Sequence, residues 1–134
     1  MSVVINLSAV LIAAISGVIV GFLWYGPLFG KMWLYLVDKT PQEMKKVKVI
    51  RRYIIMFFSM LLMAFVFAQI LFLALAHTPF DGFKVGLLIW FGFVIPTGLA
   101  NVLWTGKSKV LYMLDMGYYL VVLSVMGIVL TAWK

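Results

Sequence analysis

The sequence predicts an all-α integral membrane protein whose four transmembrane helices form a compact bundle. Hydrophobic residues make up 66% of the 134 positions and charged residues only 11%, against roughly a quarter charged in soluble domains. Several uncharged runs also reach the roughly 20 apolar residues that cross a bilayer core. We expect one domain over residues 1–134, with spans at about 3–25, 52–76, 82–104 and 110–133.

The first span carries a stripe of small residues at every fourth position, namely Ala9, Ala13, Gly17 and Gly21. Such a stripe lets helix backbones approach closely in lipid, where apolar burial does not drive helices together. Two partners stay open for this packing face: another span of the same chain, or a second copy in a homodimer. Because the stretch lacks a basic n-region and a cleavage site, we expect a mature helix and not a signal peptide.

A short interfacial segment and a cytoplasmic helix extension are expected between spans one and two. Gly26-Pro27 should end the first helix, because the residue before a proline disfavours the α conformation. The segment Phe29–Val37 is too short to span, and its aromatic rings and Lys31 suit the membrane interface. The next helix should then begin in water with an N-cap, a first-turn proline and a capping-box glutamate: Thr40, Pro41 and Glu43.

Basic residues gather in two of the three connections between the spans. The first and third connections hold nine of them, whereas the opposite side holds two, Lys84 and Lys134. Because cytoplasmic loops carry the excess of Lys and Arg, we expect a plasma-membrane protein with both termini outside the cytoplasm. This placement also accounts for the net charge of +7 without nucleic acid as a partner. Five basic residues are candidate contacts to anionic headgroups: Lys45, Lys46, Lys48, Arg51 and Arg52.

The end of the first span carries a set of residues that resembles a known family: Gly21, Trp24, Tyr25, Gly26, Pro27, Phe29, Gly30, Lys31 and Trp33. With them, nearly the whole chain is similar to the small bacterial and archaeal membrane proteins known as domain of unknown function 1761. Asn101 and the Gly117-Tyr118 pair belong to the same resemblance. It implies a four-span protein of this length and assigns no activity or site. The family pattern often has Asn where this chain has Asp115, and His where it has Tyr119.

Polar residues of three spans are expected to meet near the cytoplasmic ends of the helices. Asp115 is the only acidic residue inside a predicted span, and an ionisable group in a membrane helix is a functional candidate by default. Asn101 lies at a similar level in span three, at helical spacing from Trp90, Thr97 and Trp104. The candidate polar pocket therefore consists of Asp115, Asn101, Tyr118, Tyr119, Trp24 and Tyr25.

Two interpretations without a ligand remain open for these residues. The polar side chains serve only as interhelical hydrogen bonds, or Asp115 either reaches the interface or pairs with Lys107 or Lys109. The sequence contains no cysteine, no metal-ligand cluster, no Ser-His-Asp set and no paired carboxylates. We therefore expect no metal, no cofactor and no enzymatic activity.

The composition favours a structural or assembly role, in which the protein associates with itself or with another membrane protein. The alternative is a small oligomeric channel or transporter whose polar pocket opens to the cytoplasm. A cavity that holds Asp115 together with Asn101 favours transport, and a bundle without such a cavity favours the structural role. The expected partners are a bilayer with anionic headgroups and a second copy or another membrane protein.

Overall fold

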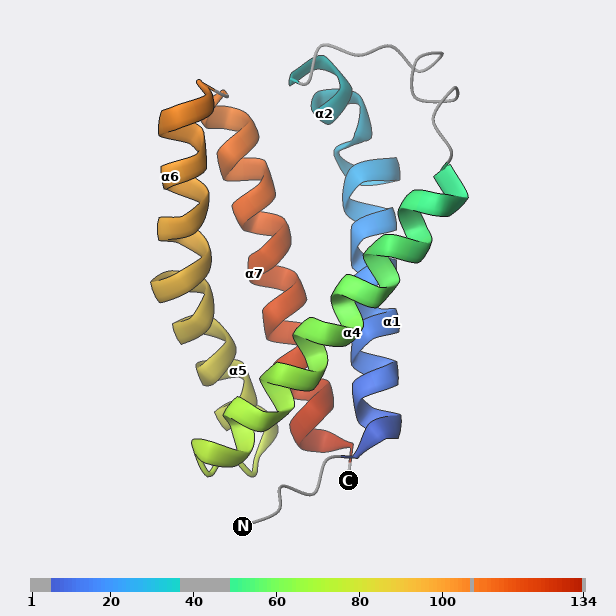
Figure 1. The fold of residues 1–134 in the computed structure, drawn as a ribbon, viewed down its shortest axis with the longest axis vertical. Coiled ribbons are helices and arrows are strands. Elements are labelled where there is room, and N and C mark those ends of the chain that lie inside the picture. Colours follow the sequence, from blue (N-terminus) through green and yellow to red (C-terminus); the bar gives the residue numbers. More distant parts are fainter. Residues whose placement is uncertain (1–5, 37–48, 107, 134) are drawn as a thin grey trace.

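The computed structural model describes residues 6–36, 49–106 and 108–133, and the secondary structure of this part of the chain is helical throughout. Four stretches in it are long and apolar enough to cross a membrane: Leu7–Leu28, Ile50–Leu73, Pro79–Thr105 and Lys109–Ala132. The all-α class and the four spans are thereby confirmed. Both ends of the described chain lie at the lower end of the molecule, and the turn after Thr105 lies at the upper end (Figure 1).

The first span does not end at Gly26-Pro27 as predicted. Helix α1 (Leu7–Leu23) runs directly into a π-helical turn, η1 (Trp24–Leu28), which contains the proline. In this wider turn the hydrogen bond to the carbonyl five residues earlier replaces the α-helical bond to the carbonyl four residues earlier. The Phe29 amide donates to the Trp24 carbonyl at 2.9 Å. Helix α2 (Gly30–Leu36) follows and occupies the predicted interfacial segment.

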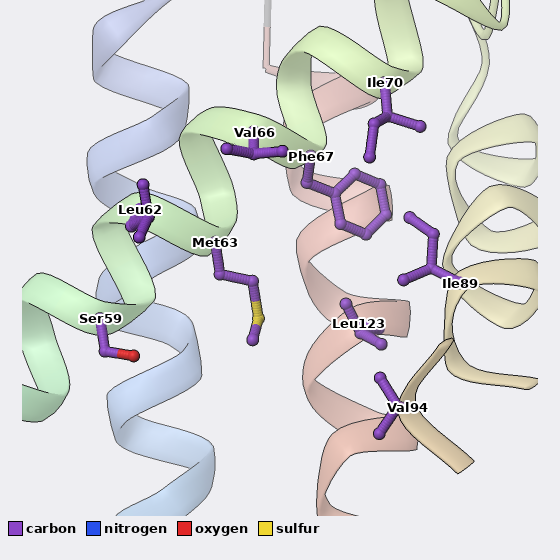
Figure 2. Close-up of a pocket in the computed structure, with 9 residues that line it drawn as sticks. All are labelled: Ser59, Leu62, Met63, Val66, Phe67, Ile70, Ile89, Val94 and Leu123. Carbon is purple, nitrogen blue, oxygen red and sulfur yellow. The ribbon is translucent and has the colours of Figure 1, made fainter. Parts of the chain in front are cut away.

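The predicted helix start at Thr40, Pro41 and Glu43 and three candidate lipid contacts, Lys45, Lys46 and Lys48, lie outside the described residues. Helix α4 (Val49–Leu73) carries the other two contacts, Arg51 and Arg52, both exposed in its first turn. It crosses the other spans obliquely (Figure 1). An apolar groove lies where α4 passes the third span (Figure 2).

The third span consists of α5 (Pro79–Ile89), a second π-helical turn, η2 (Trp90–Val94), and α6 (Ile95–Thr105). Thr78 is the N-cap of this span and accepts from the Asp81 amide at 3.1 Å, with Pro79 in the first turn. Inside η2, the Ile95 amide donates to the Trp90 carbonyl, again five residues earlier. The next residue, Pro96, has no amide hydrogen to donate.

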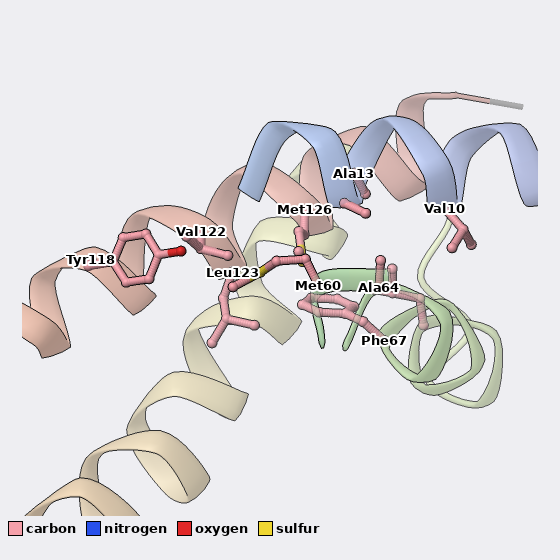
Figure 3. Close-up of a cluster of buried hydrophobic side chains, with 11 residues drawn as sticks. Val10, Ala13, Met60, Ala64, Phe67, Tyr118, Val122, Leu123 and Met126 are labelled. Atoms are coloured by element: carbon pink, nitrogen blue, oxygen red, sulfur yellow. The ribbon is translucent and has the colours of Figure 1, made fainter. Parts of the chain in front are cut away.

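Helix α7 (Lys109–Ala132) is central, because it contacts α1, α4, α5 and α6. Its buried face meets α1 and α4 in one hydrophobic core (Figure 3). Most of the core side chains come from these three helices: Val10, Ala13 and Ala14 from α1; Met60, Ala64, Phe67 and Leu71 from α4; Tyr118, Val122, Leu123 and Met126 from α7.

The predicted packing stripe Ala9, Ala13, Gly17 and Gly21 is buried within the chain. A Cβ on Gly17 would come within 2.9 Å of the Met60 sulfur, and one on Gly21 within 3.1 Å of the Tyr118 hydroxyl. The stripe therefore lets α1 approach α4 and α7. The sequence left open whether this face packs against the same chain or against a second copy. In the structure, spans of the same chain pack against it.

Helices α5 and α7 cross through glycines that the sequence reasoning missed. A Cβ on Gly82 would overlap the Gly127 carbonyl oxygen, and one on Gly86 would come within 2.7 Å of the Leu123 carbonyl oxygen. Gly82 and Gly86 form a G-x-x-x-G pair, with the same spacing as Gly17 and Gly21 of the first span. This pair fixes the third span against α7.

Candidate functional site

Asp115 lies in the second turn of α7 and accepts a hydrogen bond from η1. The Tyr25 hydroxyl donates to its Oδ1 at 2.5 Å. The Tyr25 ring is itself held between two aromatic edges, with centroids 5.2 Å from Tyr118 and 5.8 Å from Trp33. The π-helical turn places Tyr25 so that a residue of the first span holds the carboxylate of the fourth.

Of the two lysines considered as partners of Asp115, Lys109 forms no ion pair with it in the described structure. Within the described residues the ion pair found joins Lys84 to Asp81 at 3.5 Å, near the start of α5. Lys109 is exposed, and Lys107 lies outside the described residues. The Asp115 carboxylate is instead half-buried and points to Tyr25, because its position on α7 faces the first span and not the turn.

A cavity of about 180 Å³ lies beside Asp115, between α6 and α7. Three residues of the predicted pocket line it, namely Asp115, Asn101 and Tyr119. The described residues that line it are Gly98, Asn101, Val102, Leu111, Tyr112, Asp115, Met116 and Tyr119, and none of these has a basic side chain.

Gly98 of α6 and Tyr112 of α7 let the two helices approach closely at this cavity. A Cβ on Gly98 would come within 2.8 Å of the Met116 methyl carbon and 3.0 Å of the Tyr112 ring. The Tyr112 hydroxyl donates to the Ile95 carbonyl at 2.8 Å. The sequence reasoning missed Gly98 and Tyr112, although Tyr112 lies three residues before Asp115 and thus on the same helix face.

The remaining residues of the predicted pocket lie on the α1 side of α7 and anchor the two helices. The Trp24 indole donates to the Leu114 carbonyl at 3.1 Å, and the buried Tyr118 hydroxyl donates to the Gly17 carbonyl at 3.3 Å. Neither side chain lines the cavity. The predicted group therefore divides: three residues line the cavity, Tyr25 holds the carboxylate, and two join α1 to α7.

Trp90 and Asn101 of the third span both lie next to Met116 of α7. The Trp90 indole donates to the Met116 carbonyl at 2.8 Å, and Asn101 lines the same cavity as Met116. The π-helical turn η2 lies between them and interrupts the regular helical spacing of the span. Because Asn101 is exposed as well as cavity-lining, it lies at the mouth of the cavity.

The arrangement suits a small cation better than a tightly ligated metal. Within the described residues no group of three or more His, Cys, Asp and Glu is close enough to hold a metal ion. The described lining of the cavity includes one carboxylate, one side-chain amide and two tyrosines. Carboxylates and aromatic rings both attract positive charge, and rings do so for organic ammonium groups in particular.

One comparison with known proteins identifies related chains. The family model described as protein of unknown function (DUF1761) matches residues 8–131, which is nearly the whole chain and confirms the resemblance. No significant match to a curated protein or to a solved structure is found.

Proposed function

The chain belongs to the DUF1761 family, and because this family has no assigned activity, we propose a function from the cavity at Asp115. We propose that this multi-pass membrane protein binds a small cation in the cavity between α6 and α7 and acts as a channel or transporter for it. The observation that carries the proposal is a half-buried carboxylate in a cavity whose described lining residues include no basic side chain.

The energetics of a charged group in a membrane helix support a cation as the ligand. An acidic residue at the centre of a helix costs roughly 2.5–3.5 kcal/mol on insertion scales, and less near its end. Tyr25 occupies Oδ1, and the described residues form no second hydrogen bond or ion pair with Asp115. A bound cation would offset the remaining cost of the negative charge.

The proposed orientation places the cavity near the cytoplasm. Nine basic residues lie in the first and third connections and two on the opposite side, which favours a plasma-membrane protein with both termini outside. Asp115 is six residues into α7, so it lies about 9 Å from the start of the helix at 1.5 Å per residue. In this orientation a cation enters the cavity from the cytoplasmic side, past Asn101.

A flux assay tests the proposal. Purified protein in proteoliposomes should transport Na⁺, K⁺ or tetramethylammonium, and Asp115→Asn should abolish the flux because the amide carries no charge. Asp81→Asn is the matched control, since Asp81 is the acidic residue of the ion pair with Lys84 and lines neither described cavity. Equal flux in wild type and Asp115→Asn would refute the proposal, as would no flux of any of the three cations.

A structural role through self-association is the second candidate. Only 6% of the apolar window of the third span is buried within the chain. Its outer face exposes large aromatic side chains, Phe91, Phe93 and Trp104. We propose that a second copy covers this face in an oligomer. Subunit counting by single-molecule photobleaching in nanodiscs should then show at least two copies per disc, and Phe91→Ala with Phe93→Ala should shift the count toward one.

A further inference from the structure

The structure contains a second cavity that the proposed binding of a small cation at Asp115 does not use. It is an apolar groove of about 340 Å³ between α4 and the third span, with α7 at its base (Figure 2). Apart from Ser59, its lining is hydrophobic: Leu62, Met63, Val66, Phe67 and Ile70 from α4, Ile89 and Val94 from the third span, and Leu123 from α7.

The apolar groove continues the polar cavity along the seam between α7 and the third span. On α7, Tyr119 lines the polar cavity and Leu123, one turn later, lines the groove. On the third span, Gly98 lines the cavity and Val94, one turn earlier, lines the groove. Residues four apart lie on one helix face. The two cavities are therefore consecutive segments of one seam, polar at Asp115 and apolar beyond Tyr119.

The groove is accessible from the side that α4 presents to its surroundings. Leu62 and Val66 line it and are 66% and 44% exposed. In a membrane this face meets acyl chains. An apolar chain can therefore enter sideways from the bilayer, while a charged head enters the polar cavity.

We infer that the two cavities form one site for an amphipathic cation, with an ammonium head at Asp115 and a single apolar chain in the groove. This inference rests on the proposed function and specifies its ligand. Together the volumes fall within the range of roughly 300–1,000 Å³ that is typical of ligand pockets. The Tyr119 ring lies between the two segments, where it can face the ammonium carbons.

Charge complementarity selects a monocationic amphiphile over a bilayer phospholipid. A phospholipid carries a phosphate next to its apolar chains. That phosphate would lie close to the Asp115 carboxylate, and the part of the chain that the structure describes supplies no basic side chain to the cavity to balance it. Like charges in an environment of low dielectric repel strongly. A lone ammonium group carries a positive charge and is therefore attracted to the Asp115 carboxylate.

Photolabelling in phosphatidylcholine nanodiscs tests this inference. The probe is a trimethylammonium amphiphile with one long alkyl chain that carries a diazirine. It should label peptides of α4 that contain groove residues. A sulfate-headed probe with the same chain should label them roughly tenfold less, and so should the cationic probe on Asp115→Asn.

A groove-filling variant tests the position of the chain. Val66→Phe should reduce labelling of the groove peptides, whereas Val110→Phe, the same change at an exposed position outside both cavities, should not. Equal labelling by the cationic and sulfate probes would overturn the inference, as would labelling that Val66→Phe leaves unchanged.

A tetramethylammonium control separates failure of this inference from failure of the proposed function. If tetramethylammonium raises the unfolding temperature of wild type but not of Asp115→Asn, while the long-chain probe does not label the groove, the cation site stands and the amphiphile inference is wrong. If neither cation acts through Asp115, both are wrong.

Discussion

Tyr25 is the residue that holds the Asp115 carboxylate in place. Interhelical hydrogen bonds in membranes contribute about 0.6 kcal/mol on average, and bonds to ionised groups are roughly twice as strong as neutral ones. We predict that Tyr25→Phe lowers the free energy of unfolding by about 1 kcal/mol and weakens cation binding, because the carboxylate loses its donor. Tyr35→Phe is the control, since Tyr35 is 85% exposed. Unfolding in mild detergent and cation titrations measure both effects, and identical values for the two variants would contradict the prediction.

The scarcity of polar groups made part of the site predictable at the level of residues. Asp115, Asn101 and Tyr119 stand out in apolar helices, and they line one cavity. The directions of Trp24 and Tyr118 were not predictable, because a helix that is apolar on all sides has no periodic pattern to show which face meets which neighbour.

The crossing of α5 and α7 is the element whose geometry tolerates the least change. We predict that Gly82→Ala destabilises the protein by about 1–3 kcal/mol or more, because the new methyl group overlaps the Gly127 carbonyl oxygen and the helices must separate. Gly92→Ala is the matched control in the same span, since its Cβ would meet no atom within 4 Å. Thermal unfolding in detergent compares them, and equal stability of the two variants would show that the crossing is not tight.

The first turn of α4 is expected to hold anionic lipids. Arg51 and Arg52 are exposed there, and a basic residue near an anionic leaflet contributes roughly 1 kcal/mol. The double variant Arg51→Gln, Arg52→Gln should therefore retain fewer phosphatidylglycerol molecules in native mass spectrometry than wild type. Lys84→Gln, a change at the opposite end of the bundle, should retain the same number. Binding that does not fall with salt would contradict the electrostatic origin.

At the level of elements, the spans were predicted but the two π-helical turns, η1 and η2, were not. Hydrophobic runs were sufficient to locate the spans. Gly26-Pro27 was expected to end the first helix, whereas the π-helical turn η1 contains the proline. The turn η2 interrupts the regular helical spacing of the third span between Trp90 and Asn101. Each turn contains an indole that donates to α7, Trp24 to the Leu114 carbonyl and Trp90 to the Met116 carbonyl, and such contacts between distant segments are not visible in a local sequence pattern.

At the scale of the whole molecule, the bundle has two chemically different ends. The described chain begins and ends at one of them, and α2 and the turn between α6 and α7 lie at the other (Figure 1). An even number of spans requires this arrangement. The first and third connections join the spans at the end with α2, and these two connections contain nine basic residues in the sequence.

The membrane orientation can be measured directly because the chain contains no cysteine. Any introduced cysteine is the only thiol, so its labelling has no background. We predict that a membrane-impermeant maleimide labels Phe80→Cys in intact cells, and labels Thr105→Cys only after permeabilisation, since the excess of basic residues keeps the Thr105 end in the cytoplasm. Both positions are exposed, so burial does not limit labelling at either. The reverse pattern would invert the orientation and would place the mouth of the Asp115 cavity outside the cell, where it would take up its cation from the opposite side.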